Sequence, residues 1–186
     1  MRPNLDAVWP ACVGALAVLY ANVGGGDWAR RSAIAWMMGS WGARLTVQAL
    51  YAPGAEGLRN PTPLTSYFRF LTTAIFFSIP AVLASLNPDP SLSRLELGAS
   101  AIWVIAFAAQ TTADRQLLRF ASNPENAGRA CRSGLWRYWS NAHAMFELLI
   151  WIALALFASA SPRGWVAIAC IPARIVWLFP RTDTRG

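Results

Sequence analysis

The polar side chains best placed to do chemistry lie inside or beside long apolar runs. His143 and Glu147 are one helical turn apart at the start of one run. Arg44, Asp114 and Arg174 lie in or beside three others. A carboxylate in apolar surroundings either pairs with a cation or has its pKa raised, and intramembrane ionisable residues commonly mark functional sites. We therefore expect Glu147 to be the leading functional residue.

The same residues also allow a purely structural interpretation. Arginines near the ends of membrane spans commonly extend toward lipid headgroups, and buried polar pairs hold transmembrane helices together. A salt bridge from Glu147 to Arg137 or Arg174 would need no ligand. Pairing of Arg44 or Arg174 with Asp114 would be equally structural. The residue types alone leave both interpretations open.

His143 and Glu147 have the spacing of two metal ligands on one helix face, but two ligands make only half of a site. No second histidine is present in the chain. We therefore predict no metal and interpret His143 as an interfacial residue with a hydrogen-bonded ring. Axial ligation of a haem or pigment, or a part in proton transfer, are the alternatives.

The connection at about 114–143 is basic and rich in aromatic residues, with Trp136, Arg137, Tyr138 and Trp139 in succession. Aromatic rings collect at membrane surfaces for physical reasons that involve no ligand. Alternatively, Arg137 holds a phosphate and the aromatic rings line an adenine or lipid slot. Both interpretations place this connection at the surface of a membrane.

The elements that position these residues are apolar runs separated by glycine and proline clusters. The chain has 186 residues, of which 55% are hydrophobic and 10 are tryptophan. Its runs approach the length of about 20 residues that crosses a bilayer. We predict an all-α, polytopic transmembrane helix bundle of about six spans in a single domain, 1–186. The expected spans are 7–23, 33–51, 68–86, 95–113, 144–160 and 165–179.

The charged residues predict the orientation and exclude one class of partner. All 16 basic residues are arginine, the net charge is +7, and the arginines cluster beside apolar runs rather than in a nucleic-acid-binding motif. Membrane lipids are the expected partners, and nucleic acid is not. Ten loop or terminal arginines fall on one side and four on the other. The positive-inside rule then places both termini and the 114–143 connection in the cytoplasm, and we expect the bacterial inner membrane.

This topology brings the polar residues of the spans to the same depth in the cytoplasmic half. Residues four apart share one face of a helix, so each pair below projects in one direction. Their convergence predicts either a polar cavity open to the cytoplasm or a set of structural pairs. The residues are Arg44 with Gln48, Gln110 with Asp114, His143 with Glu147, and Arg174.

Three kinds of residue carry structural expectations. Gly39 and Ala43, with Gly42 beside them, give one span a face of small residues for close helix packing. Prolines within spans should kink them, at Pro10, Pro80 and Pro172. The cysteines are odd in number and match neither a zinc site nor a disulfide framework, so we expect free thiols at Cys12, Cys131 and Cys170.

Two runs of the sequence resemble a known membrane family. They are A-D-R-Q-L-L-R-F at 113–120 and N-x-G-R-x-C-R-S-G-L-W-R-Y at 126–138, with weaker agreement at 41–45 and 161–165. Together they resemble the steroid 5-alpha-reductase-like integral membrane proteins of unknown specific function. The resemblance implies NADPH as a cofactor and hydride transfer to a carbon–carbon double bond of an apolar lipid substrate. It implies catalytic roles for Glu147 and Tyr138, and cofactor binding by Arg137, Arg174, Trp136, Asp114 and Arg44.

The chain departs from the family where the nucleotide is bound. Family members have S-R-H-P-N-Y at a run that reads W-S-N-A-H-A here, at 139–144, and an acid where this chain has Gln110. Three hypotheses therefore stand. The first is a reductase with a diverged nucleotide motif, and the second is a non-catalytic accessory subunit of a larger membrane complex that contacts lipid, quinone or pigment. The third is a small lipid carrier.

Overall fold

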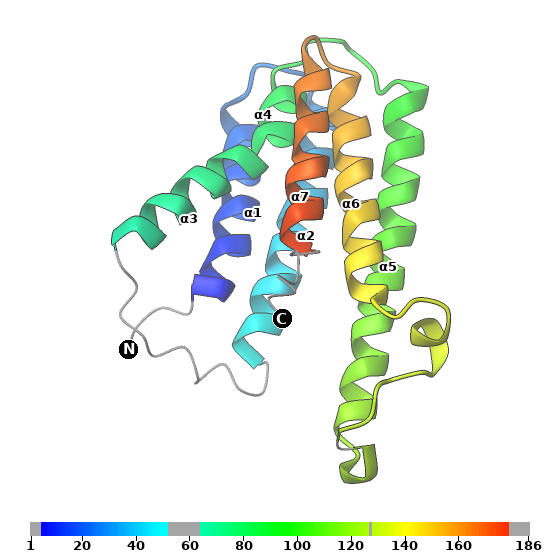
Figure 1. The fold of residues 1–186 in the computed structure, drawn as a ribbon. Helices are drawn as coiled ribbons and strands as arrows, with labels where there is room; N and C mark the ends of the chain where they lie inside the picture. Colours follow the sequence, from blue (N-terminus) through cyan, green and yellow to red (C-terminus); the bar gives the residue numbers. More distant parts are fainter. Residues whose placement is uncertain (1–4, 52–63, 127, 179–186) are drawn as a thin grey trace.

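The computed structural model describes residues 5–51, 64–126 and 128–178, and in these parts of the chain every regular element is helical. The expected all-α fold is confirmed (Figure 1). The α-helices are α1 Leu5–Val23, α2 Trp28–Tyr51, α3 Leu64–Phe77, α4 Ile79–Ser85, α5 Arg94–Ala121, α6 Ala142–Ser159 and α7 Cys170–Leu178. Short 3₁₀ turns add η2 Pro124–Asn126, η3 Gly134–Arg137 and η4 Gly164–Ala169.

Each expected span coincides with a helix, but some boundaries differ. The third span is broken at Ser78, because Pro80 lies in the first turn of α4 and has no N–H to donate to the preceding helix. The sixth span begins as η4 and continues as α7. α5 runs through Asp114 to Ala121 rather than ending at 113, so the connection before α6 comprises only 122–141.

With α3 and α4 taken as one broken span, successive spans run in opposite directions, which gathers the connections at two ends (Figure 1). Residues 24–27, 86–93 and 160–163 lie together at the top of the view, named here the short-loop end. Residues 122–141 lie at the opposite, long-loop end. The polar residues expected to converge all lie in the half of the bundle nearer the long-loop end.

A buried arginine holds the short-loop end together. Arg30, at the start of α2, is 1% exposed and pairs with Glu96, which also completes the capping box of α5 with Ser93. Its guanidinium also donates to the carbonyl oxygens of Asp89 and Ser91, each at 2.7 Å. The hydrogen bond to Glu96 raises the pKa of Arg30 above its usual value. One side chain therefore joins α2, the 86–93 loop and α5.

α1 and α2 come into direct backbone contact where Gly14 and Gly42 meet. A Cβ added at Gly42 would lie 2.5 Å from the carbonyl oxygen of Pro10 and 3.1 Å from the Cα of Gly14. A Cβ at Gly14 would lie 3.2 Å from the carbonyl oxygen of Met38. The expected small-residue face of α2 is therefore confirmed, and glycine is required there because backbone meets backbone.

Gly42→Ala should destabilise the protein by about 1–3 kcal/mol, because the added methyl forces two backbones apart. Gly98→Ala is the matched control, since a Cβ at Gly98 meets nothing within 4 Å. There the better helix propensity of alanine should add up to about 1 kcal/mol. Thermal unfolding in detergent should move the two variants in opposite directions, and equal shifts would contradict the close α1–α2 contact.

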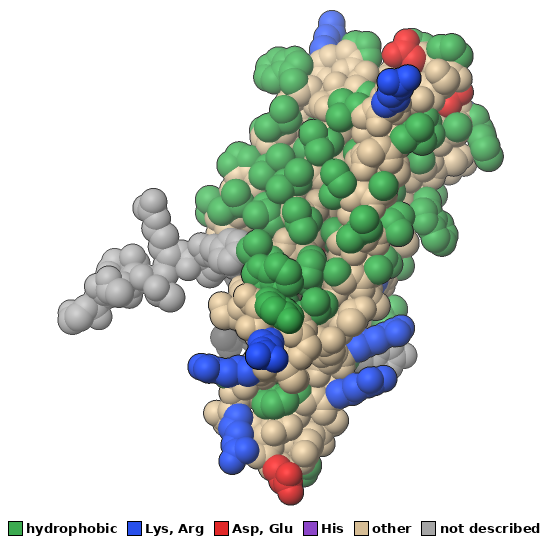
Figure 2. Space-filling model, turned by 90° about the vertical axis from the view of Figure 1, so that its right-hand side faces the viewer, with side chains coloured by type: hydrophobic (Ala, Val, Ile, Leu, Met, Phe, Trp, Pro, Cys, Tyr) green, Lys and Arg blue, Asp and Glu red, His purple; other side chains and the backbone are tan. Residues whose placement is uncertain are grey.

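Two helices, Arg94–Ala121 and Ala142–Ser159, are long and apolar enough by length and composition to cross a membrane. Shorter apolar helices lie at Val8–Val23, Phe70–Ser85 and Gly164–Val176. Only 28% of the apolar window in α5 is buried by the rest of the protein, against 56% in α6. Figure 2 shows apolar side chains over the middle of one face, with basic side chains gathered toward one end beside an acidic side chain at its tip, and charges of both signs at the other end. Six crossings remain a prediction.

Candidate functional site

Glu147 is the centre of a buried polar network in the half of the bundle nearer the long-loop end. Asn141 caps α6 by accepting a hydrogen bond from the backbone N–H of Ala144, and the helix carries Glu147 into the core, where it is 0% exposed. Both carboxylate oxygens are occupied. Oε1 accepts from Arg174 at 2.6 Å, Trp151 at 3.0 Å and Trp41 at 3.1 Å, whereas Oε2 accepts from Gln110 at 2.7 Å.

Arg174 approaches Glu147 from α7 inside a cage of aromatic rings. Its guanidinium carbon lies 5.3–5.9 Å from four ring centroids, distances at which a cation is attracted to the ring face. The rings also contact one another edge to face, for example Trp41 and Trp151 at 5.3 Å between centroids. Together they fill the space beside the ion pair with Trp9, Trp41, Phe77 and Trp151.

A second ion pair continues the network toward the long-loop end. Arg44 from α2 donates to Asp114 of α5 at 2.5 Å and to the side-chain oxygen of Gln110 at 2.5 Å. Asp114 also accepts from Gln48 and contacts the imidazole of His143 at 2.8 Å. Gln110 joins the two halves because its oxygen accepts from Arg44 while its nitrogen donates to Glu147.

The predicted convergence of polar residues is therefore confirmed, but these residues do not line one open cavity. Gln110 and Glu147 are 0% exposed, and Arg174 is 5% exposed. Arg44, Gln110, Asp114, His143, Glu147 and Arg174 form a connected set, in which the acids are paired with arginine or histidine. The arrangement is a closed, nearly saturated network.

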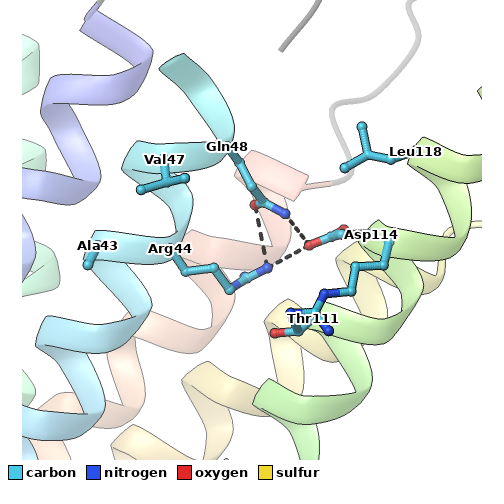
Figure 3. A pocket seen from close by; sticks show the side chains of 8 residues that line it. Ala43, Arg44, Val47, Gln48, Thr111, Asp114 and Leu118 are labelled. Carbon is cyan, nitrogen blue, oxygen red and sulfur yellow. Dashed lines mark hydrogen bonds and ion pairs between the residues drawn. The ribbon is translucent and has the colours of Figure 1, made fainter. Parts of the chain in front are cut away.

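An open pocket lies at the edge of this network, between α2 and α5 (Figure 3). It has a volume of about 350 Å³, near the lower limit of the range of about 300–1,000 Å³ typical of ligand sites. Figure 3 shows Arg44 and Gln48 reaching from α2 to Asp114 on α5. The pocket is lined by Ala43, Arg44, Val47, Gln48, Thr111, Asp114, Arg115 and Leu118.

The connection between α5 and α6 folds back against the end of α5. Gly134 adopts a positive φ of 59°, which glycine readily allows in a turn, and the backbone N–H of Leu135 donates to the side chain of Gln116 at 2.9 Å. The indole N–H of Trp136 donates to the carbonyl oxygen of Ala113 at 2.9 Å. Trp136 therefore lies beside the residue that precedes Asp114, but its indole N–H is already used in a hydrogen bond to the backbone.

Two other residues that the resemblance implicates lie on the surface. Tyr138 is 74% exposed and contacts the ring of Trp139, with 6.0 Å between centroids. Arg137 is exposed and makes no hydrogen bond or ion pair with the described residues. The structure therefore separates Arg137 and Tyr138 from the buried pair of Glu147 and Arg174.

The tryptophans that bind Glu147 are not among the residues predicted from the sequence. Trp151 lies four residues after Glu147 on the same helix, a spacing that was available as a signal. Trp41 lies three residues before Arg44, so it shares a face of α2 with a residue already under consideration. The expected free cysteines are confirmed at Cys12, Cys131 and Cys170. Within the described ranges, no three His, Cys, Asp or Glu side chains gather as metal ligands would.

Comparisons with known proteins identify the family and no closer relative. No curated protein and no solved structure matched the chain. A match was found to the family described as "Protein of unknown function (DUF1295)", and it extends over residues 2–181. Because this match covers nearly the whole chain, the protein belongs to the DUF1295 family.

Proposed function

We propose that the chain is an integral membrane protein that serves as a non-catalytic accessory subunit of a larger membrane complex. Membrane insertion is supported by α5, whose apolar window is only 28% buried. The core helix of a water-soluble protein would bury most of such a window, because exposed apolar area costs about 25 cal/mol per Å². We expect lipid or a neighbouring subunit to cover this surface.

The observation that carries the non-catalytic role is the closure of Glu147. Its carboxylate is fully buried and accepts hydrogen bonds from Arg174, Gln110, Trp41 and Trp151. A catalytic acid or base must reach the substrate directly or through one water, and this carboxylate has no free approach. Asn141, in the run that carries the nucleotide motif in the resembling family, instead caps α6.

A contact with a partner subunit is supported by an exposed tryptophan in the first half of α2. Trp36 lies about two turns inside the helix and is 72% exposed. Trp28 and Trp165 are similarly exposed but lie at the short-loop end, where the headgroup region would hold them. Trp36 lies too deep for that explanation, and tryptophan is enriched among the residues that dominate protein interfaces.

The second candidate is an NAD(P)H-dependent reductase of apolar lipid substrates, in line with the resemblance to steroid 5-alpha-reductase-like proteins. It is favoured by the open pocket beside the network, where Arg44 and Arg115 could meet phosphate. Glu147 and Tyr138 would then orient substrate, and Arg137, Arg174, Trp136 and Asp114 would hold the cofactor. This role requires Glu147 and Arg174 to separate and Tyr138 to move inward.

Titration with NADPH separates the two candidates. We expect no saturable quenching of tryptophan fluorescence in detergent up to about millimolar NADPH, because Arg174 is paired with Glu147 in the core and Arg137 lies apart from that pair on the surface. Saturable micromolar binding that Arg137→Gln weakens, and that Arg129→Gln leaves unchanged, would support the reductase instead. Arg129 is the matched control because it is an exposed arginine in the same connection.

The accessory role has its own readout in the native membrane. Extracted in mild detergent, the chain should migrate on a native gel in an assembly much larger than its own micelle. Migration as a single chain, under conditions that preserve known complexes of the same membrane, would contradict the accessory role. Absence of NADPH binding would then still stand as evidence against the reductase.

A further inference from the structure

We propose that the pocket between α2 and α5 binds the phosphodiester headgroup of an anionic phospholipid. The proposal rests on the membrane insertion proposed above and adds a ligand class to it. The ligand would place its phosphate between Arg44 and Arg115, which both line the pocket. Its acyl chains would extend past Val47 and Leu118 (Figure 3). Three properties of the pocket carry the argument, namely unpaired donors, apolar walls and depth.

The polar side of the pocket has cationic donors in excess. Arg115 lines the pocket and makes no hydrogen bond or ion pair with any residue that the structure describes. Arg44 is paired through its terminal nitrogens, but its Nε is buried without a hydrogen-bond partner in the described chain. Asp114 is the one acid among the described lining residues, so the two arginines leave one positive charge. Guanidinium groups recognise phosphate oxygens by paired hydrogen bonds.

The remaining walls suit an acyl chain rather than a soluble anion. Val47 is 53% exposed and Leu118 is 56% exposed, so the rim of the pocket is apolar and uncovered. Ala43 continues this surface along α2. A free anion such as inorganic phosphate would gain nothing from these side chains, whereas an acyl chain would remove them from water.

The pocket also lies at the depth of a headgroup. α5 begins at Arg94, and Arg115 follows after a rise of about 30 Å at about 1.5 Å per residue. That distance equals the thickness of a typical hydrocarbon core. With the start of α5 at one surface of the bilayer, Arg115 reaches the other surface, where lipid phosphates are found.

The test is a lipid titration on the detergent-purified protein with two matched arginine variants. Phosphatidylglycerol should raise the thermal unfolding midpoint, and phosphatidylcholine should raise it less. Arg115→Gln should weaken the apparent affinity for phosphatidylglycerol about tenfold, the equivalent of one charge-assisted hydrogen bond. Arg119→Gln removes an exposed arginine one turn further along α5 that does not line the pocket, so it should change the affinity less than about twofold.

Equal weakening by the two variants would overturn the proposal, because it would reduce the effect to general surface charge. Stabilisation by soluble glycerol phosphate at the same concentration as the lipid would also overturn it, in favour of a free-anion site. A carbonate wash of membranes separates this failure from failure of the proposed insertion. If the protein stays in the washed membrane but Arg115→Gln and Arg119→Gln have the same affinity for phosphatidylglycerol, the lipid site is contradicted and the proposed membrane insertion is not.

Discussion

Glu147→Leu is expected to lower the free energy of unfolding by about 3–5 kcal/mol, which is the usual cost of removing one partner of a buried ion pair. Leucine has nearly the volume of glutamate, so little of this loss comes from a cavity. It comes from Arg174, which is 5% exposed and would keep its charge without the carboxylate that lies 2.6 Å away. The indole N–H groups of Trp41 and Trp151 also lose their acceptor.

The measurement is unfolding by heat or by SDS in detergent, with two controls. Glu125→Leu removes an exposed acid from η2 and should change the stability by less than about 0.5 kcal/mol. The double variant Glu147→Leu with Arg174→Met should recover the part of the loss that comes from the unpaired cation, because an apolar pair of similar volume often replaces a buried ion pair at little cost. The indole N–H groups of Trp41 and Trp151 stay without their acceptor. A double variant no more stable than Glu147→Leu alone would show that the ion pair is not the source of the effect.

The helices could be predicted because apolar runs bounded by glycine and proline clusters carry a strong local signal. The end of α5 could not be predicted from that signal. Beyond Asp114 the helix continues through Arg115, Gln116 and Arg119, where hydropathy falls although the backbone remains helical to Ala121. A hydropathy pattern detects only the apolar part of a helix. The polar end of α5 has the composition of a loop, so this pattern does not show that it is helical.

The residues of the polar network could be predicted from the sequence, but whether they line an open cavity or pair with one another could not. Residues four apart share a helix face, and alternating helix directions bring Arg44, Gln110, Glu147 and Arg174 to one depth. Whether these side chains surround an open cavity or close on one another depends on the packing of neighbouring rings. The four aromatic side chains around Arg174 come from α1, α2, α3 and α6. Such tertiary packing has no signature in the spacing of residues along one helix.

The short-loop end leads to the second large expected effect. Arg30 and Glu96 are 66 positions apart. In the sequence, Arg30 is only one of the four loop arginines on the less basic side of the predicted topology. In the structure Arg30 is 1% exposed and its guanidinium joins Glu96 to the backbone carbonyls of Asp89 and Ser91. The sequence alone does not distinguish an exposed loop arginine from a buried arginine that holds the fold together.

Arg30→Met should therefore lower the free energy of unfolding by about 3–5 kcal/mol, because it leaves the Glu96 carboxylate buried without its cation. The carbonyls of Asp89 and Ser91 lose their donor at the same time, so the loop should also become sensitive to protease. Unfolding in detergent and limited proteolysis of the 86–93 loop measure the two consequences.

Arg94→Met is the matched control for Arg30→Met, because Arg94 is an exposed arginine at the same end of the bundle, at the first residue of α5. Both variants remove one arginine from the same side, so any effect on the orientation of insertion is shared between them. Arg94→Met should change the stability by less than about 0.5 kcal/mol and leave the loop protected. If the two variants unfold at the same temperature and are cut at the same rate, the buried contacts of Arg30 do not hold this end together. A loss confined to Arg30→Met would instead show that one side chain fixes α2 and α5 to the loop before α5.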